Sequence, residues 1–304
     1  MSLHRKLGQN IIQSSTGQVI IGSSKKMYLP GLHGFSVYEV WGAFVKQLKK
    51  SSLRERASGI SFNIVMAIPP TLIFIFTLIP YLPISKGITR QLFALIRDVV
   101  PGEKNNSVII HFLDDFLHQP RNGLLSIGLI VSIYFSSNAM MGILRSFDKN
   151  YSGFLKRNMW GRRRAALKLT IITFLLVMLC LLLLIAQRAV LKYIGIDNAT
   201  IRMLIANARW IFIVLLTFSI VAFIYRHGPA VAKKWPLLTP GSVFATTAMI
   251  IATALVTFWV NNFSNYNKLY GSIGAIFILM SLIFVNSFAV LMGFELNVTL
   301  SYMR

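Results

Sequence analysis

The chain holds a small set of polar and charged residues that could bind an anion, and they lie within, beside or between long apolar runs. Arginine attracts phosphates and carboxylates because its planar guanidinium offers several N–H donors. An acid at the same level could hold one arginine while no substrate is bound. The residues that we expect to form such a substrate site are Asn63, Pro69, Pro70, Ser137, Asn138, Arg145, Arg226, His227, Asn286 and Glu295.

Two adjacent prolines, Pro69 and Pro70, fall within the first apolar run. A proline inside a helix removes a backbone donor and costs about 3 kcal/mol. We expect a broken helix here, with the carbonyls near Val65 and Met66 left without partners, and such breaks are typical of transport sites. The alternative is a packing kink, in which neighbouring hydroxyl groups satisfy those carbonyls.

Glu295 lies at the end of the last apolar run, where an acid is costly unless it reaches water or a cation. We expect Arg56, Arg145 and Arg226 at the same level. Two roles are consistent with this position of Glu295: a salt bridge to one of these arginines, or a relay for protons or substrate. The hydroxyl and amide side chains of the second and sixth runs likewise suit either helix–helix hydrogen bonds or substrate contacts.

One group of residues has the spacing of a metal site. His111, Asp114, Asp115 and His118 share one face of an expected helix and could hold zinc. The same pattern is what the polar side of any amphipathic helix shows, so we expect a solvated face, no metal and no cofactor. The single cysteine, Cys180, lies within an apolar run and predicts neither a disulfide nor a thiolate metal site.

The elements that carry these residues are six apolar runs, each about the length that crosses about 30 Å of hydrocarbon. They are residues 62–83, 123–143, 168–187, 210–225, 242–260 and 272–294. The chain is 55% hydrophobic and only 13% charged, with a mean hydropathy of +0.63. These values predict an all-α polytopic membrane protein with six transmembrane helices, and they exclude a water-soluble enzyme fold.

The net charge of +22 follows the expected topology. Of the 31 Lys and Arg residues, 21 fall in the two terminal segments and the connections 145–168 and 226–240, against 10 in the other connections. Because positive charge stays cytoplasmic, both termini should be cytoplasmic in a bacterial inner membrane. The basic connections therefore give no ground for expecting nucleic-acid binding.

Two further parts flank the spans. Residues 1–37 are expected to be a flexible cytoplasmic arm, and 38–304 the membrane domain. Within that domain, residues 38–50 predict a helix in the cytoplasmic headgroup layer, suited to surface anchoring or to recognition of anionic lipid. Residues 84–122 predict a two-helix periplasmic cap, broken at Pro101 and Gly102.

Three segments resemble the YihY/BrkB family of membrane proteins. RASGISFNIVMAIPPTLIF at 56–74 resembles the first span of that family, and YRHGP at 225–229 with the following KKWPLLTPGSVFAT resembles its fourth-to-fifth connection. LYGSIGAIFILMSLIFVNSFAVLMGFELNVTL at 269–300 resembles its closing span. The similarity covers roughly residues 40 to 300, with departures at Gly59, Asn63 and the cap.

This resemblance implies a six-span bacterial inner-membrane protein. Some members are described as virulence or serum-resistance factors, others as transporters, and some relatives carry a ribonuclease name. The chain offers no clustered carboxylates for two metal ions, so we expect no nuclease activity and no enzyme.

Two classes of function remain open. The first is a transporter or lipid-handling protein for an anionic or amphipathic substrate, passive or ion-coupled because no nucleotide-binding loop is present. The second is a structural or partner-binding envelope protein without transport activity. The expected partners are membrane lipids with anionic headgroups, and a second copy of the chain or another envelope protein is also possible.

Overall fold

The computed structural model describes residues 22, 25, 27–28, 31–32, 34–78, 122–148, 151, 153–194, 199–262 and 265–304. Within these residues the named elements are seven helices. They are α3 (Val37–Lys50), α4 (Leu53–Leu78), α7 (Asn122–Phe147), α8 (Met159–Ile194), α9 (Ala199–His227), α10 (Pro240–Asn262) and α11 (Asn265–Met303). The all-α prediction is therefore confirmed.

Four segments are long and apolar enough to cross a membrane: Ser126–Phe147, Trp210–His227, Pro240–Val260 and Ile276–Met303. They correspond to the second, fourth, fifth and sixth apolar runs. The first and third runs fall in α4 and α8, whose described residues do not reach the same threshold. Six transmembrane spans thus remain a prediction. Three predictions fall outside the described residues. They are the periplasmic cap (residues 84–121 of its predicted range), the group of four possible metal ligands within it, and most of the N-terminal arm.

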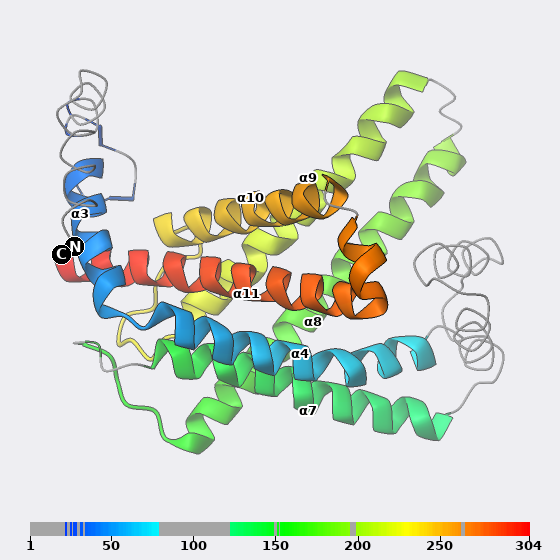
Figure 1. Cartoon of the computed structure of the whole chain (residues 1–304), viewed down its shortest axis with the longest axis horizontal. Helices are drawn as coiled ribbons and strands as arrows, with labels where there is room; N and C mark the ends of the chain where they lie inside the picture. Colours follow the sequence, from blue (N-terminus) through cyan, green and yellow to red (C-terminus); the bar gives the residue numbers. More distant parts are fainter. Residues whose placement is uncertain are drawn as a thin grey trace.

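The six long helices form a closed circuit. Each packs against the next, from α4 through α7, α8, α9 and α10 to α11, and α11 packs back against α4. In Figure 1, α4, α7, α10 and α11 run side by side, while α8 and α9 cross them obliquely. Because the circuit closes, residues from all six helices can meet on its inside.

The buried residues concentrate at one end of this bundle, which also carries the C-terminus and α3. We call it the packed end and define it as residues 53–61, 137–170, 221–246 and 287–304. Its central cluster takes apolar side chains from all six helices, among them Ile60, Leu144, Leu169, Val221, Ala245 and Leu291. All six are essentially inaccessible to solvent.

The rest of the six helices, which we call the far half, has few buried side chains. In its described positions Ala67, Ser132 and Cys180 are the buried non-glycine residues. Large apolar side chains point outward instead, including Phe62, Ile130, Leu215, Leu255 and Ile276. An exposed apolar surface of this extent suits contact with lipid hydrocarbon.

The predicted break in the first apolar run is wrong. Helix α4 continues through Pro69 and Pro70 from Leu53 to Leu78, and Figure 1 shows it as one ribbon. The Thr71 hydroxyl donates to the Ala67 carbonyl at 2.7 Å and lies 3.4 Å from the Ser136 hydroxyl of α7. The helix therefore passes the two prolines as a continuous element packed against α7, and the Thr71 hydroxyl meets the Ala67 carbonyl, not the carbonyls of Val65 and Met66.

Helix α3 lies across the end of α11 (Figure 1). A capping box starts it: the Ser36 hydroxyl accepts from the Glu39 amide, and the Glu39 carboxylate accepts from the Ser36 amide at 2.9 Å. Val40 and Phe44 then bury their side chains in a cluster with residues of α11. The helix predicted at 38–50 is confirmed as Val37–Lys50; its position in a headgroup layer remains a prediction.

Candidate functional site

The centre of the packed end is a carboxylate that is fully buried. Glu295, on α11, accepts three hydrogen bonds: from Arg56 Nη1 of α4 at 2.5 Å, from Tyr151 Oη at 2.5 Å and from Gln47 Nε2 of α3 at 3.0 Å. Its side chain has no exposed area, and that of Arg56 is 11% exposed. One acid thus ties together α3, α4, α11 and the connection after α7.

Arg56 is also bound on its other side. Its Nη2 donates to the Ser146 carbonyl of α7 at 2.6 Å. Its Nε is buried and meets no hydrogen-bond acceptor in the described ranges. Removing either member of a buried pair leaves an uncompensated charge and costs about 3–5 kcal/mol. The pair therefore holds α4 and α11 together only while both charges are present.

Aromatic rings surround this ion pair. Phe294 stacks on Phe147 with ring centroids 3.9 Å apart and planes 8° apart. Trp235 and Tyr151 approach the same ring at 5.7 and 5.8 Å, and Tyr225 lies at 6.4 Å. These rings come from α7, α9 and α11 and from the connections α7–α8 and α9–α10. They fill the middle of the bundle at the packed end. We call them, with Phe154, the aromatic plug.

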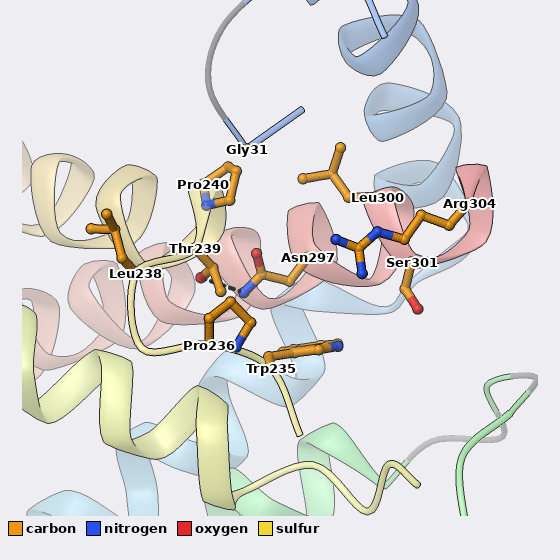
Figure 2. Close-up of a pocket in the computed structure, with 10 residues that line it drawn as sticks. All are labelled: Gly31, Trp235, Pro236, Leu238, Thr239, Pro240, Asn297, Leu300, Ser301 and Arg304. Atoms are coloured by element: carbon orange, nitrogen blue, oxygen red, sulfur yellow. Dashed lines mark hydrogen bonds between the residues drawn. The ribbon is translucent and has the colours of Figure 1, made fainter. Parts of the chain in front are cut away.

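Helices α10 and α11 cross very closely beside the plug. A Cβ built on Gly293 would lie 2.4 Å from the Gly241 carbonyl oxygen, and one built on Gly241 would lie 2.2 Å from that of Gly293. Asn297 then caps α10: its Oδ1 accepts from the Gly241 amide at 2.9 Å, and its Nδ2 donates to Thr239 Oγ1 at 3.0 Å. Figure 2 shows this amide at a pocket of about 100 Å³, with Trp235 on the same side.

Two predicted residues, Asn63 and Ser137, lie beyond the plug along their helices. Asn63 follows Arg56 by seven residues and Ser137 precedes Phe147 by ten, so they stand about 10–15 Å from the plug at a rise of about 1.5 Å per residue. Asn63 donates to the Gly59 carbonyl and packs against Gly142 of α7. The Ser137 hydroxyl is buried and, within the part of the chain that the structure describes, has no hydrogen-bond partner; the same holds for the Ser287 hydroxyl on α11.

Two of the predicted amides are already paired. Asn138 accepts from Arg163 Nη1 at 2.6 Å, and that guanidinium lies 4.7 Å from the centre of the Tyr134 ring. Asn286 donates to the Leu282 carbonyl at 2.9 Å and lies 3.3 Å from Thr253 Oγ1 of α10. The Asn138–Arg163 contact joins α7 to α8, and the Asn286–Thr253 contact joins α11 to α10.

The remaining predicted residues are not brought to Glu295. Arg145 is exposed on α7, whereas Arg226 and His227 are half-buried at the end of α9. His227 stacks on Phe223, with ring centroids 5.8 Å apart. Pro69 is exposed on α4. Of the three arginines that we expected near Glu295, the one that pairs with it is Arg56.

Comparison with known proteins identifies the family of this chain. The family described as Virulence factor BrkB matches residues 44–304. The chain belongs to the BrkB family. It is 28% identical over 266 residues to a Bacillus subtilis (strain 168) protein named "Putative ribonuclease-like protein YfkH", covering 85% of this chain and 95% of that one.

A second relative of this BrkB protein is named "UPF0761 membrane protein" and comes from Chromohalobacter salexigens. It is 25% identical over 256 residues, covering 82% of this chain and 60% of the relative. No solved structure matches the chain. Together with the four apolar helices, these matches identify a membrane protein.

Gln47 and Tyr151 are the site residues of this BrkB protein that the sequence did not predict. They lie 248 and 144 residues from Glu295 along the chain, so no local spacing marks them. Burial raises the pKa of the Tyr151 hydroxyl well above its usual value, which keeps the group protonated as a donor to Glu295. Within the described ranges, no three His, Cys, Asp or Glu side chains are grouped as metal ligands would be.

Proposed function

We propose that this BrkB protein is a transporter or lipid-handling protein of the bacterial inner membrane, passive or ion-coupled, that moves an anionic or amphipathic substrate. The observation that carries the proposal is the buried Glu295–Arg56 pair at the centre of the helix bundle. Charges inside membrane helices are costly, and they commonly mark substrate or ion pathways.

In this proposal Glu295 holds Arg56 while no substrate is bound. A phosphate or carboxylate of the substrate competes with Glu295 for the same guanidinium, because both offer paired oxygens to its N–H donors. On its other side Arg56 donates to a backbone carbonyl, that of Ser146, which can stay in place during the exchange. The aromatic plug forms the closed gate on this side.

The polar residues beyond the plug support a route toward Arg56. Two buried hydroxyls, of Ser137 and Ser287, have no hydrogen-bond partner among the described residues, and buried groups of this kind usually bind water or a ligand. Asn63, Asn138 and Asn286 would provide further amide contacts along that route. Arg145, Arg226 and His227 would attract the anion outside the plug, on the cytoplasmic side.

The proposed orientation places both termini in the cytoplasm and turns the packed end of the bundle toward that side of the membrane. The terminal segments and the connections at this end carry 21 of the 31 Lys and Arg residues. Single-cysteine labelling in a Cys180→Ala background tests it: Lys156→Cys should be labelled only from inside. Labelling of that residue from the periplasm would overturn the orientation.

The transport proposal is tested in vesicles that contain the purified protein. Scrambling of NBD-labelled phosphatidylglycerol, followed by dithionite quenching, and chloride and phosphate flux are measured beside protein-free vesicles. Arg56→Gln should abolish the activity. Arg162→Gln is the matched control, because Arg162 forms a more exposed ion pair with Asp148 at the same end, and it should keep the activity.

A second function, a structural or partner-binding envelope protein, is favoured by one observation. Helix α4 passes its two prolines without a break, and a continuous helix suits a scaffold better than a broken transport helix. Vesicles in which the wild-type protein moves neither lipid nor anion would support this function and overturn transport.

We do not propose an enzyme. Three of the described acids are engaged in structural contacts: Glu39 in the α3 cap, Asp148 with Arg162 and Glu295 with Arg56. A two-metal nuclease needs carboxylates that converge on a shared site. Incubation of the purified protein with labelled RNA and Mg²⁺ or Mn²⁺ should leave the RNA intact, and cleavage lost in Glu295→Gln would contradict this.

A further inference from the structure

A pocket lies between α3 and the end of α11, apart from the route described above. It has a volume of about 200 Å³. Four residues of α3 and three of α11 line it: Ala43, Lys46, Gln47, Lys50, Thr299, Tyr302 and Met303. Since one water occupies about 30 Å³ in the liquid, the pocket has room for a group the size of a phosphate with part of its ester.

The charge of this pocket is entirely positive. Lys46 and Lys50 stand four residues apart on α3, so they share one face of the helix, and both side chains are exposed. No acid is among the lining residues. The carboxylate of Glu295, which accepts from the lining residue Gln47, is buried and also bound by Arg56.

Gln47 connects the pocket to the buried ion pair. Its amide nitrogen carries two N–H groups and donates one to Glu295 Oε2 at 3.0 Å. The side chain also lines the pocket, so we expect its second N–H to donate to an acceptor bound there. An anion bound in the pocket would therefore hold the Gln47 side chain in the position from which it donates to Glu295.

The position of α3 suits the headgroup layer of a membrane. Val40 and Phe44 bury one face of the helix against α11, whereas Tyr38 and Trp41 are about half exposed. Exposed aromatic rings beside lysines are typical of segments at the membrane interface. Figure 1 shows the helix running across the end of α11, as a helix in the plane of that interface would.

We propose that this pocket binds the phosphate of an anionic phospholipid headgroup. Lys46 and Lys50 donate to the phosphate oxygens, and Gln47 adds an amide N–H. The bound lipid fastens α3 to α11 and holds Gln47 on Glu295. This site requires only that α3 meets the membrane surface, so it stands whether or not the protein transports a substrate.

The test measures binding of dioctanoyl phosphatidylglycerol to the full chain in detergent, from the shift of its thermal unfolding midpoint. Lys46→Gln with Lys50→Gln should weaken the apparent affinity about thirtyfold, since one lysine near an anionic lipid contributes about fivefold. Lys49→Gln is the matched control, because Lys49 is an exposed lysine of the same helix that does not line the pocket. It should change the affinity less than about twofold.

Two further probes distinguish the source of the phosphate. Dioctanoyl phosphatidylcholine and inorganic phosphate should both stabilise the protein much less than the anionic lipid does. Equal affinities in the double variant and the Lys49→Gln control would overturn the site. Equal stabilisation by inorganic phosphate would overturn the lipid as its occupant, and equal stabilisation by phosphatidylcholine would overturn the preference for an anionic headgroup.

Discussion

The packed end and the far half of the bundle use similar apolar residues in opposite ways. At the packed end Phe147 and Phe294 have no exposed surface. In the far half Phe62 is 65% exposed and Leu255 is 62% exposed, although both lie on the same helices that build the core. Apolar character alone therefore does not decide where this chain buries its side chains.

Polar contacts and close backbone approach distinguish the two regions instead. The packed end has the Glu295 network, the Asn297 cap and the contact of Gly241 with Gly293. Among the described residues, the polar contacts between far-half helices are isolated ones, such as that of Thr71 with Ser136. Since lipid hydrocarbon is as apolar as leucine, helices associate in a membrane through such close and polar contacts. The packed end should thus carry most of the stability.

Gly293→Val should have the largest effect, because the added Cβ meets the Gly241 carbonyl and Ala245, which cannot move aside. We expect no folded protein in size-exclusion chromatography after detergent extraction. Gly123→Ala in α7 is the far-half control, since nothing lies within 4 Å of its Cβ position, and it should behave as the wild type. Folded Gly293→Val protein would disprove the close α10–α11 contact.

Phe294→Ala should lower the free energy of unfolding by about 3–5 kcal/mol, because it empties the centre of the aromatic plug. Leu255→Ala removes a similarly apolar side chain that is exposed in the far half and should change it by less than about 0.5 kcal/mol. Unfolding by SDS in mixed micelles measures both. Equal losses would remove the distinction between the two regions.

Tyr151→Phe should cost about 2 kcal/mol near pH 8, because a hydrogen bond to a buried carboxylate is lost. The pKa of this hydroxyl is raised by burial above its usual value of 10.0, so its stabilising contribution is present below pH 10 and is lost as the pH rises further. Stability of the wild type should therefore fall more steeply than that of the variant above pH 10. Parallel pH profiles would contradict the buried position of this group.

Asn286→Ala should have the smallest effect, about 0.6 kcal/mol, as expected for one hydrogen bond between membrane helices. The same mixed-micelle titration detects it as a small shift in the unfolding midpoint. A loss above about 2 kcal/mol would show that the far half holds a stronger contact than its exposed side chains indicate.

The sequence predicted the helices best where a long apolar run decides them. Residues 123–143 and 242–260 correspond to α7 and α10, whose ends extend the predicted runs by a few residues. Helix α11 continues to Met303, nine residues past the predicted end, because Glu295 and Asn297 find partners there. Such partners come from distant parts of the chain and leave no mark on local hydropathy.

The candidate site was less predictable for the same reason. Because an unpaired charge is costly in a membrane, the sequence predicted that Glu295 lies at the same membrane depth as several arginines and pairs with one of them. Which arginine pairs with it depends on how α4 crosses α11, and these residues are 239 positions apart in the chain. The proline pair misled because helix propensity alone implies a break, whereas α4 stays continuous where it packs against α7, a contact with a distant part of the chain.

The central claim is that a substrate anion competes with Glu295 for Arg56, and the kinetics of Glu295→Gln test it most directly. Scrambling rates are measured in vesicles as a function of the mole fraction of NBD-labelled phosphatidylglycerol, on the fraction of protein that remains folded. Without its competitor, Arg56 should bind the lipid phosphate more tightly, so the half-saturating mole fraction should fall about tenfold, equivalent to about 1.4 kcal/mol. An unchanged or higher half-saturating fraction in Glu295→Gln would contradict the competition.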